Sequence, residues 1–194
     1  MDPLIALVLG SGWASGVNLY LVTALLGLAG RFGLADLPDG LSNPWVIGTA
    51  AALFAVEFVA DKIPYLDSAW DAAHTVIRPL GAAALGYLLT GDAGGLAQLG
   101  ATGGSGILAL AAHAAKASTR AAVNTSPEPF SNSLVSLGED GLVAFVLWMA
   151  ITNPVVALIL VALLVIAGAA LTIALWRFVR RRRGQRDTRA PRVR

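Results

Sequence analysis

Acidic side chains lie close together in a chain that is otherwise largely apolar. Between residues 56 and 79 the sequence reads VEFVADKIPYLDSAWDAAHTVIRP, with four carboxylates, a lysine, a histidine and an arginine. Glu57 and Asp61 are four residues apart, so a helix would place both on one face. Glu57 follows the apolar run WVIGTAAALFAV and is the group least able to reach water. A charged group at such a depth predicts a functional site in a membrane protein.

The second half of this stretch predicts a polar stripe along one short helix. Its members are spaced four, three and four residues apart, and they are Asp67, Asp71, His74 and Arg78. Trp70, Ala73 and Ile77 would fall on another side of the same helix. We therefore expect an amphipathic helix over 67–78, which either lies in the membrane interface or re-enters the protein.

A basic stripe lies on a later apolar run. Its members are spaced three, four and four residues apart, and they are His113, Lys116, Arg120 and Asn124. We expect Glu57 and Asp61 to face Lys116 and Arg120 inside a helical bundle, with His113 deepest, because unpaired charges are costly at membrane depth. The acidic and basic stripes together predict a substrate or proton site.

Two further carboxylates, Glu139 and Asp140, open another apolar run, where the positive end of a helix would stabilise them. A simpler interpretation stays open for this pair and for the basic groups. The carboxylates could serve only as helix caps, and the lysines and arginines near span ends could extend their charged heads to water.

The first apolar run is interrupted by GSGWASGVN, which contains Gly10, Gly12, Gly16 and Asn18. Three glycines and two serines favour a break in the helix. A half-helix beginning near Gly16 would direct its positive end at an anion, as broken helices do in transporters. The alternative is close helix packing, since Gly12 and Gly16 have the spacing of small residues at helix interfaces.

Long apolar runs must position these residues. Hydrophobic residues make up 56% of the 194-residue chain and charged residues 13%, whereas a soluble domain carries about 25% charged residues. The runs are long enough to cross a bilayer as helices. They predict an all-α membrane bundle of about six transmembrane helices, over residues 4–30, 45–63, 79–90, 103–122, 138–152 and 154–178. Residues 1–178 would form one transmembrane domain, followed by a basic, disordered tail over 179–194.

Arginines near the end of the chain predict its orientation. From residue 177 onward there are nine arginines and one aspartate, whereas the preceding part carries more acidic than basic groups. The positive-inside rule then places both termini of a six-span protein in the cytoplasm. The tail is expected to contact anionic lipid headgroups, and this role is favoured over nucleic-acid binding.

Other patterns narrow the function. Gly-Ser-Gly occurs at 10–12 and again at 104–106, and two groups of three spans would suit an inverted repeat. The chain has no cysteine, and neither histidine lies in a metal-binding pattern, so we expect no metal and no cofactor. The glycine-rich GATGGSG lacks the lysine of a phosphate-binding loop. An enzyme is therefore not favoured, although a lipid-modifying activity stays open. A homodimer is compatible with so small a bundle.

Three stretches resemble one family. GVNLYLVTALLGLAGRFG, VEFVADKIPYLDSAWDAAHTVIRPLGAAALG and SLGEDGLVAF resemble small bacterial multi-pass membrane proteins known as a domain of unknown function (four-one-two-six in that series). The resemblance covers roughly residues 10–154, and the charged middle stretch is its most specific part. It implies a protein of the bacterial cytoplasmic (inner) membrane, and it implies no substrate and no reaction.

The function must therefore come from the residues themselves. We expect a small transporter or carrier of a small or lipidic solute, with a buried charged site that is proton-coupled. The alternative is a non-transporting scaffold or accessory subunit that ion pairs inside the membrane hold together. The acidic excess of the predicted site favours protons or cations, whereas the helix break and the basic stripe favour an anion.

Overall fold

Six helices make up the described part of the chain, which in this computed structural model covers residues 3–63, 65–91, 93–124 and 129–187. They are α1 (Pro3–Arg31), α2 (Pro44–Ala60), α3 (Leu66–Leu89), α4 (Gly95–Val123), α5 (Pro129–Thr152) and α6 (Pro154–Asp187). Four of them begin at a proline, which suits the first helical position because it has no amide hydrogen to leave unpaired. The described residues form no strand, so the predicted all-α class is confirmed.

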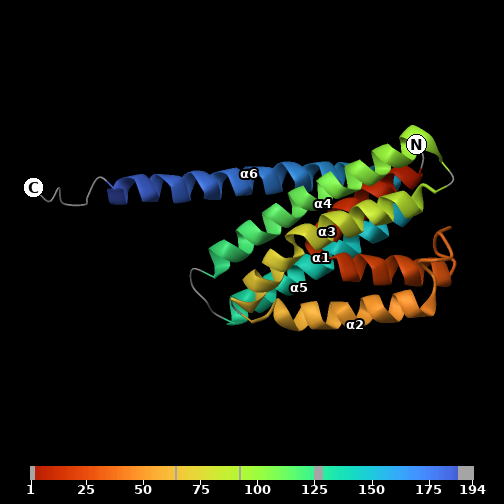
Figure 1. The fold of residues 1–194 in the computed structure, drawn as a ribbon, viewed down its shortest axis with the longest axis horizontal. Coiled ribbons are helices and arrows are strands. Elements are labelled where there is room, and N and C mark those ends of the chain that lie inside the picture. The colour runs from red at the N-terminus through yellow and green to blue at the C-terminus, as the bar shows by residue number, and fades with distance from the viewer. Residues whose placement is uncertain (1–2, 64, 92, 125–128, 188–194) are drawn as a thin grey trace, which may run out of the picture.

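α1 folds back on itself at Asn18 instead of crossing the bundle. Asn18 has extended backbone angles (φ −150°, ψ 96°) within an otherwise helical segment. In Figure 1 the red helix enters from the end of the molecule marked N and returns to that end. Leu4 shares a surface pocket there with Asp36 and Asp39 of the following loop. α1 is therefore a hairpin of two half-helices, and the predicted break in the first helix is present.

The other five helices run between the two ends of the bundle in alternating directions (Figure 1). Because α1 makes no net crossing, Pro3 and the end of α6 lie at opposite ends of the molecule. Our expectation that both termini lie on one side of the membrane is therefore wrong. Hydropathy could not reveal this, since a folded-back helix and a spanning helix of this length are equally apolar.

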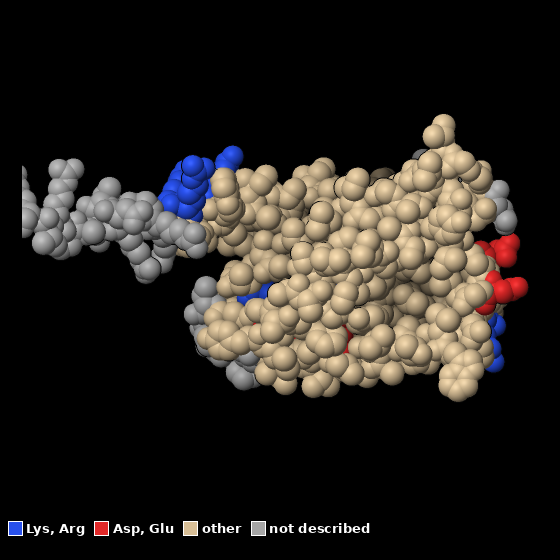
Figure 2. All heavy atoms as spheres, in the orientation of Figure 1, with Lys and Arg blue, Asp and Glu red and all other residues tan. Residues whose placement is uncertain are grey.

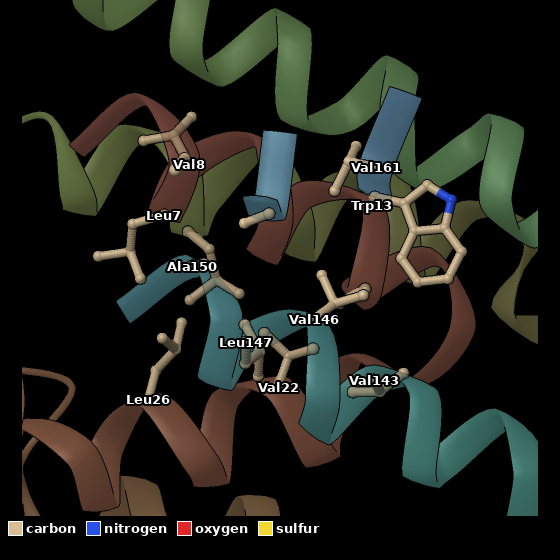
Figure 3. Packing of buried hydrophobic residues seen from close by; sticks show 14 of the residues in the cluster. Leu7, Val8, Trp13, Val22, Leu26, Val143, Val146, Leu147, Ala150 and Val161 are labelled. Carbon is tan, nitrogen blue, oxygen red and sulfur yellow. The ribbon is translucent and has the colours of Figure 1, made fainter. Parts of the chain in front are cut away.

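The two halves of α1 form the centre of the apolar core. In Figure 3, Leu7 and Val8 from the first half and Leu26 from the second half all lie toward the left of the view. Residues of α5 pack against both halves, and they are Val143, Val146, Leu147 and Ala150. α1 is thus buried by the surrounding helices along most of its length, unlike a helix at the lipid surface.

Glycines let the first half of α1 approach its neighbours closely. A β-carbon on Gly12 would lie 2.8 Å from the Ser105 α-carbon of α4, and one on Gly16 would overlap the same helix one turn further on. Gly10 faces α5 in a similar way. These glycines remain helical, so they serve close packing. The break falls at Asn18, inside the stretch where we expected it and two residues after Gly16.

The outer surface of the bundle is apolar, as contact with lipid requires. Large apolar side chains at least 49% exposed occur around it, and they include Ile5, Val59, Leu80, Ile107, Phe145 and Ile166. Figure 2 shows charged atoms mostly at the two ends of the molecule, with an uncharged band between them. This distribution identifies a membrane protein.

Four helices among the described residues are long and apolar enough to span a membrane by length and composition. They are Pro3–Arg31, Gly95–Val123, Phe130–Thr152 and Pro154–Arg181, and α2 is apolar but shorter. α1 meets the criterion yet folds back. The predicted count of about six transmembrane helices is therefore too high, while the multi-pass character is supported.

Residues 67–78 form the first half of α3, which continues through Pro79 to Leu89. Their polar stripe faces the interior, whereas Val76 and Leu80 are 62% and 66% exposed. The segment is amphipathic as predicted, and the face that it buries inside the protein is the polar one.

α6 continues past residue 178, where we expected the last span to end and a disordered tail to begin. It remains helical to Asp187, which agrees with the high helix propensity of arginine. Residues 188–194 of the predicted tail lie outside the described part of the chain. The inverted repeat stays a prediction.

Candidate functional site

The tip of the α1 hairpin meets four other helices at one set of polar residues, the polar cluster. It comprises Asn18 of α1, Glu57 and Asp61 at the end of α2, Asp67, Asp71, His74 and Arg78 of α3, His113, Lys116 and Arg120 of α4, and Asn132, Glu139 and Asp140 of α5. The members from α2, α3 and α4 are at most 4% exposed. The acidic and basic stripes of the sequence therefore come together inside the bundle.

Arg78 is the centre of one half of the polar cluster. Its Nη2 lies 2.7 Å from Glu57 Oε1, and its Nη1 lies 3.0 Å from Asp71 Oδ1. The guanidinium is fully buried, so these carboxylates must compensate its charge in place of water. We expected Glu57 to face Lys116, but that contact is the longer one, at 3.4 Å. The main cationic partner of Glu57 therefore comes from the stripe on α3, whereas we had expected it to come from α4.

Asp61 links the two cations of the other half. Lys116 Nζ lies 2.7 Å from Asp61 Oδ2, and Arg120 Nη2 lies 3.3 Å from the same oxygen. Arg120 also pairs with Glu139 Oε2 at 2.6 Å and donates to Asn132 Oδ1 at 2.7 Å. The expected pairing of Asp61 with these two bases is therefore present. One carboxylate bridging two buried cations ties α2 to α4.

Glu139 and Asp140 do not begin a helix. α5 begins at Pro129, so both carboxylates lie nearly three turns inside it. Our interpretation of them as helix-start groups is therefore wrong, because the polar residues 129–136 are helical as well. Asp140 instead accepts a hydrogen bond from Asn18 Nδ2 at 3.0 Å, at the tip of the hairpin.

The helix break exposes backbone groups to the polar cluster. Asn18 Oδ1 accepts the amide hydrogen of Leu21 at 3.0 Å, which is the bond of an N-cap and starts the second half-helix. The first half-helix ends in carbonyls that would otherwise be bonded within a continuous helix. Val17 O accepts from Lys116 at 3.1 Å, and Gly16 O lies 3.4 Å from Arg78 Nη1. The negative end of a half-helix therefore faces the buried cations, whereas we expected a positive end to face an anion.

Hydrogen-bond partners define the proton positions on both histidines. Arg78 Nη1 donates to His113 Nδ1 at 2.8 Å, and because arginine has no acceptor, the His113 proton lies on Nε2, beside Thr75 Oγ1. His74 Nδ1 donates to the Trp70 carbonyl at 2.8 Å. Its Nε2 lies 2.9 Å from the Tyr20 hydroxyl. His113 thus joins α4 to α3 through both ring nitrogens, whereas His74 joins α3 to α1 through Nε2 alone.

The polar cluster contains more acids than bases. Six carboxylates belong to it, against three buried cations, which are Arg78, Lys116 and Arg120. Several buried carboxylate oxygens accept no hydrogen bond from the described residues, among them Glu57 Oε2, Asp61 Oδ1 and Asp140 Oδ2. Excess negative charge away from water is costly. No group of three or more possible metal ligands occurs among the described residues.

Sequence reasoning missed some members of the site. Tyr20 and Asn132 lie in otherwise unremarkable positions, and only the fold brings them to His74 and Arg120. The spacing of Asn132 and Glu139, seven residues apart on one helix face, was the available signal. Lys62 lies beside the site, and burial lowers the pKa of its ammonium although the Asp140 and Asp61 carboxylates oppose this shift.

No curated protein and no solved structure matches the chain. One family matches over residues 5–174, a range that includes the whole polar cluster and most of α1 on both sides of the break. The chain therefore belongs to the family described as Domain of unknown function (DUF4126).

Proposed function

We propose that this protein is a proton-coupled carrier of a small or lipidic solute. The observation that carries the proposal is the tip of the α1 hairpin, where freed backbone carbonyls face a buried cluster with more carboxylates than cations. Broken helices that end inside a membrane protein and face charged groups are typical of transporter binding sites.

Proton binding would reduce the excess negative charge of the polar cluster. Glu57 has one oxygen bonded to Arg78 and one with no hydrogen-bond partner among the described residues. Protonation there would lower the negative charge of the polar cluster and weaken the hold on Arg78. Arg78 and Lys116 also contact the carbonyls at the hairpin tip. A change in the charge of Glu57 would therefore alter the contacts that hold α1 at its turn.

The charge distribution supports an orientation. Lys62 and Arg177, Arg180 and Arg181 of α6 lie at the end of the bundle near the polar cluster, whereas Asp36 and Asp39 lie at the other end with Arg31. By the positive-inside rule the basic end would be cytoplasmic. α1 would then enter from the outer side, and the arginines of α6 would meet anionic headgroups.

The test measures water access to the polar cluster, which requires no knowledge of the solute. Single cysteines replace Ala60 and Ala117 in this cysteine-free chain, and membrane-impermeant maleimide is applied to oriented vesicles from each side in turn. A carrier should expose the cysteines to both sides, and the Glu57→Gln variant should change the ratio of the two rates. Ala82→Cys, in the apolar core, is the matched control and should stay unlabelled.

A scaffold is the second candidate, and one observation favours it. Arg78, Lys116 and Arg120 make ion pairs no longer than 2.7 Å. These pairs connect α2, α3, α4 and α5. A scaffold predicts protection of both cysteines from both sides. It also predicts that exchanging charges within the shortest pair of Glu57, as in Glu57→Arg with Arg78→Glu, restores folding together with every function. A carrier should recover folding and remain inactive.

A further inference from the structure

A groove opens toward lipid between the second half of α1, α2 and α3. Its volume is about 500 Å³, within the range of about 300–1,000 Å³ for ligand sites. α2 forms one wall and packs chiefly on α1, so the groove stays open between α2 and α3. Its lining extends from Trp45 to Leu53 along α2, which corresponds to about 12 Å of helix. This length is close to one leaflet of a hydrocarbon core about 30 Å thick.

The walls of this groove suit a hydrocarbon chain and not a polar molecule. Most lining residues are aliphatic, including Leu19, Leu53 and Leu85. Two polar side chains on the wall are already bonded within the protein, because Tyr20 Oη pairs with His74 and Thr23 donates to the Leu19 carbonyl. A ligand here would gain apolar contact on three sides.

The two ends of the groove differ, which gives a bound chain a direction. One end is formed by Leu41, Trp45 and Leu88 at the end of the bundle that carries the α1–α2 loop. Tryptophan prefers the membrane–water interface, where a lipid headgroup would also lie. The other end is Tyr20, next to the hairpin tip and bonded to a member of the polar cluster.

We propose that this groove binds one acyl chain of a bilayer lipid, with the headgroup near Trp45 and the methyl end near Tyr20. The site is independent of whether the polar cluster transports a solute. Through the Tyr20–His74 hydrogen bond, a chain in the groove lies next to a member of the polar cluster. Lipid composition would thereby influence the polar cluster from inside the membrane.

The experiment uses the full chain in vesicles of phosphatidylethanolamine and phosphatidylglycerol. A trace of phosphatidylethanolamine carries a photoactivatable diazirine at the methyl end of one acyl chain, and crosslinked residues are mapped by mass spectrometry. We expect labelling concentrated around Tyr20, Leu53 and Gly81. A diazirine near the glycerol end of the chain should shift the labelling toward Trp45 and Leu88.

Groove-filling variants separate this site from ordinary surrounding lipid. Ala84→Phe and Thr49→Phe change exposed lining residues and should lower the labelling severalfold without affecting folding. Ala162→Phe, an exposed alanine of the groove between α4 and α6, is the matched control and should leave it unchanged. Equal labelling of both grooves, or labelling that neither filling variant reduces, would overturn the proposal. Loss of labelling in the Tyr20→Phe variant would contradict our interpretation that the groove binds the chain by apolar contact alone.

Discussion

Replacing Arg78 by glutamine should destabilise the protein far more than replacing its partner Glu57 by glutamine. Arg78 is the nearest cation to both Glu57 and Asp71, at 2.7 and 3.0 Å. Its removal would leave these buried carboxylates with only Lys116, at 3.4 and 4.0 Å. Removing one member of a buried pair costs about 3–5 kcal/mol, and we expect Arg78→Gln to fall in this range.

The opposite substitution should be mild because the polar cluster has carboxylates in excess. Glu57→Gln keeps an oxygen that can accept from Arg78, and Lys116 keeps Asp61 at 2.7 Å. The loss should not exceed that of one hydrogen bond, about 0.5–1.5 kcal/mol. The two variants should therefore differ by at least about 1.5 kcal/mol, which is about tenfold in the unfolding equilibrium.

Equilibrium unfolding by dodecyl sulfate in mixed micelles, followed by circular dichroism, measures both free energies of unfolding. The double variant Glu57→Gln with Arg78→Gln should be more stable than Arg78→Gln alone, because it removes one unpaired carboxylate. Equal losses in the two single variants would refute the reasoning. Every carboxylate would then be charged and fully paired, and the scaffold would become the better interpretation of the site.

Three further predictions concern the α1 hairpin. Pro3→Cys and Asp36→Cys should be labelled by impermeant maleimide from the same side of the membrane and Tyr65→Cys from the other, whereas a crossing α1 would separate the first two. Gly16→Leu should prevent stable folding in thermal melts, because its side chain would overlap α4, while Gly48→Ala, with open space around it, should be neutral or stabilising by up to about 1 kcal/mol. Asn18→Ala should lower the free energy of unfolding by about 0.5–2 kcal/mol through loss of the cap. Asn18→Asp keeps the cap but places a second carboxylate opposite Asp140, so this variant should be stable in acid and lose stability as the pH rises. A melting temperature that does not change with pH would contradict this.

The pairing of the stripes was predictable because helical spacing places residues three and four apart on one face. Asp61, Lys116 and Arg120 meet as expected. The partner of Glu57 was not predictable in the same way. Spacing defines the face of a helix but not its rotation or depth against its neighbours, and these brought Arg78 of α3 closer than Lys116 of α4.

The boundaries of α5 and α6 show a second limit. Residues 129–136 and the arginines near the end of α6 fell outside the predicted spans, yet both are helical. Hydropathy detects the portion of a helix that lipid surrounds. It does not detect helical turns that polar contacts or water can stabilise beyond it.

The sequence by itself determined the class of protein, its all-α character and most of the residues that form the polar cluster. Apolar runs require helices in lipid, and charges at depth require partners. Only the tertiary structure decided that α1 turns back at Asn18 and ends its first half against Lys116. A hairpin and a straight helix satisfy the same hydropathy, and the choice depends on the Asn18 cap, the cations that receive the freed carbonyls and the glycines that let α1 approach α4. These interactions link residues up to about one hundred positions apart along the chain, so no local pattern could reveal them.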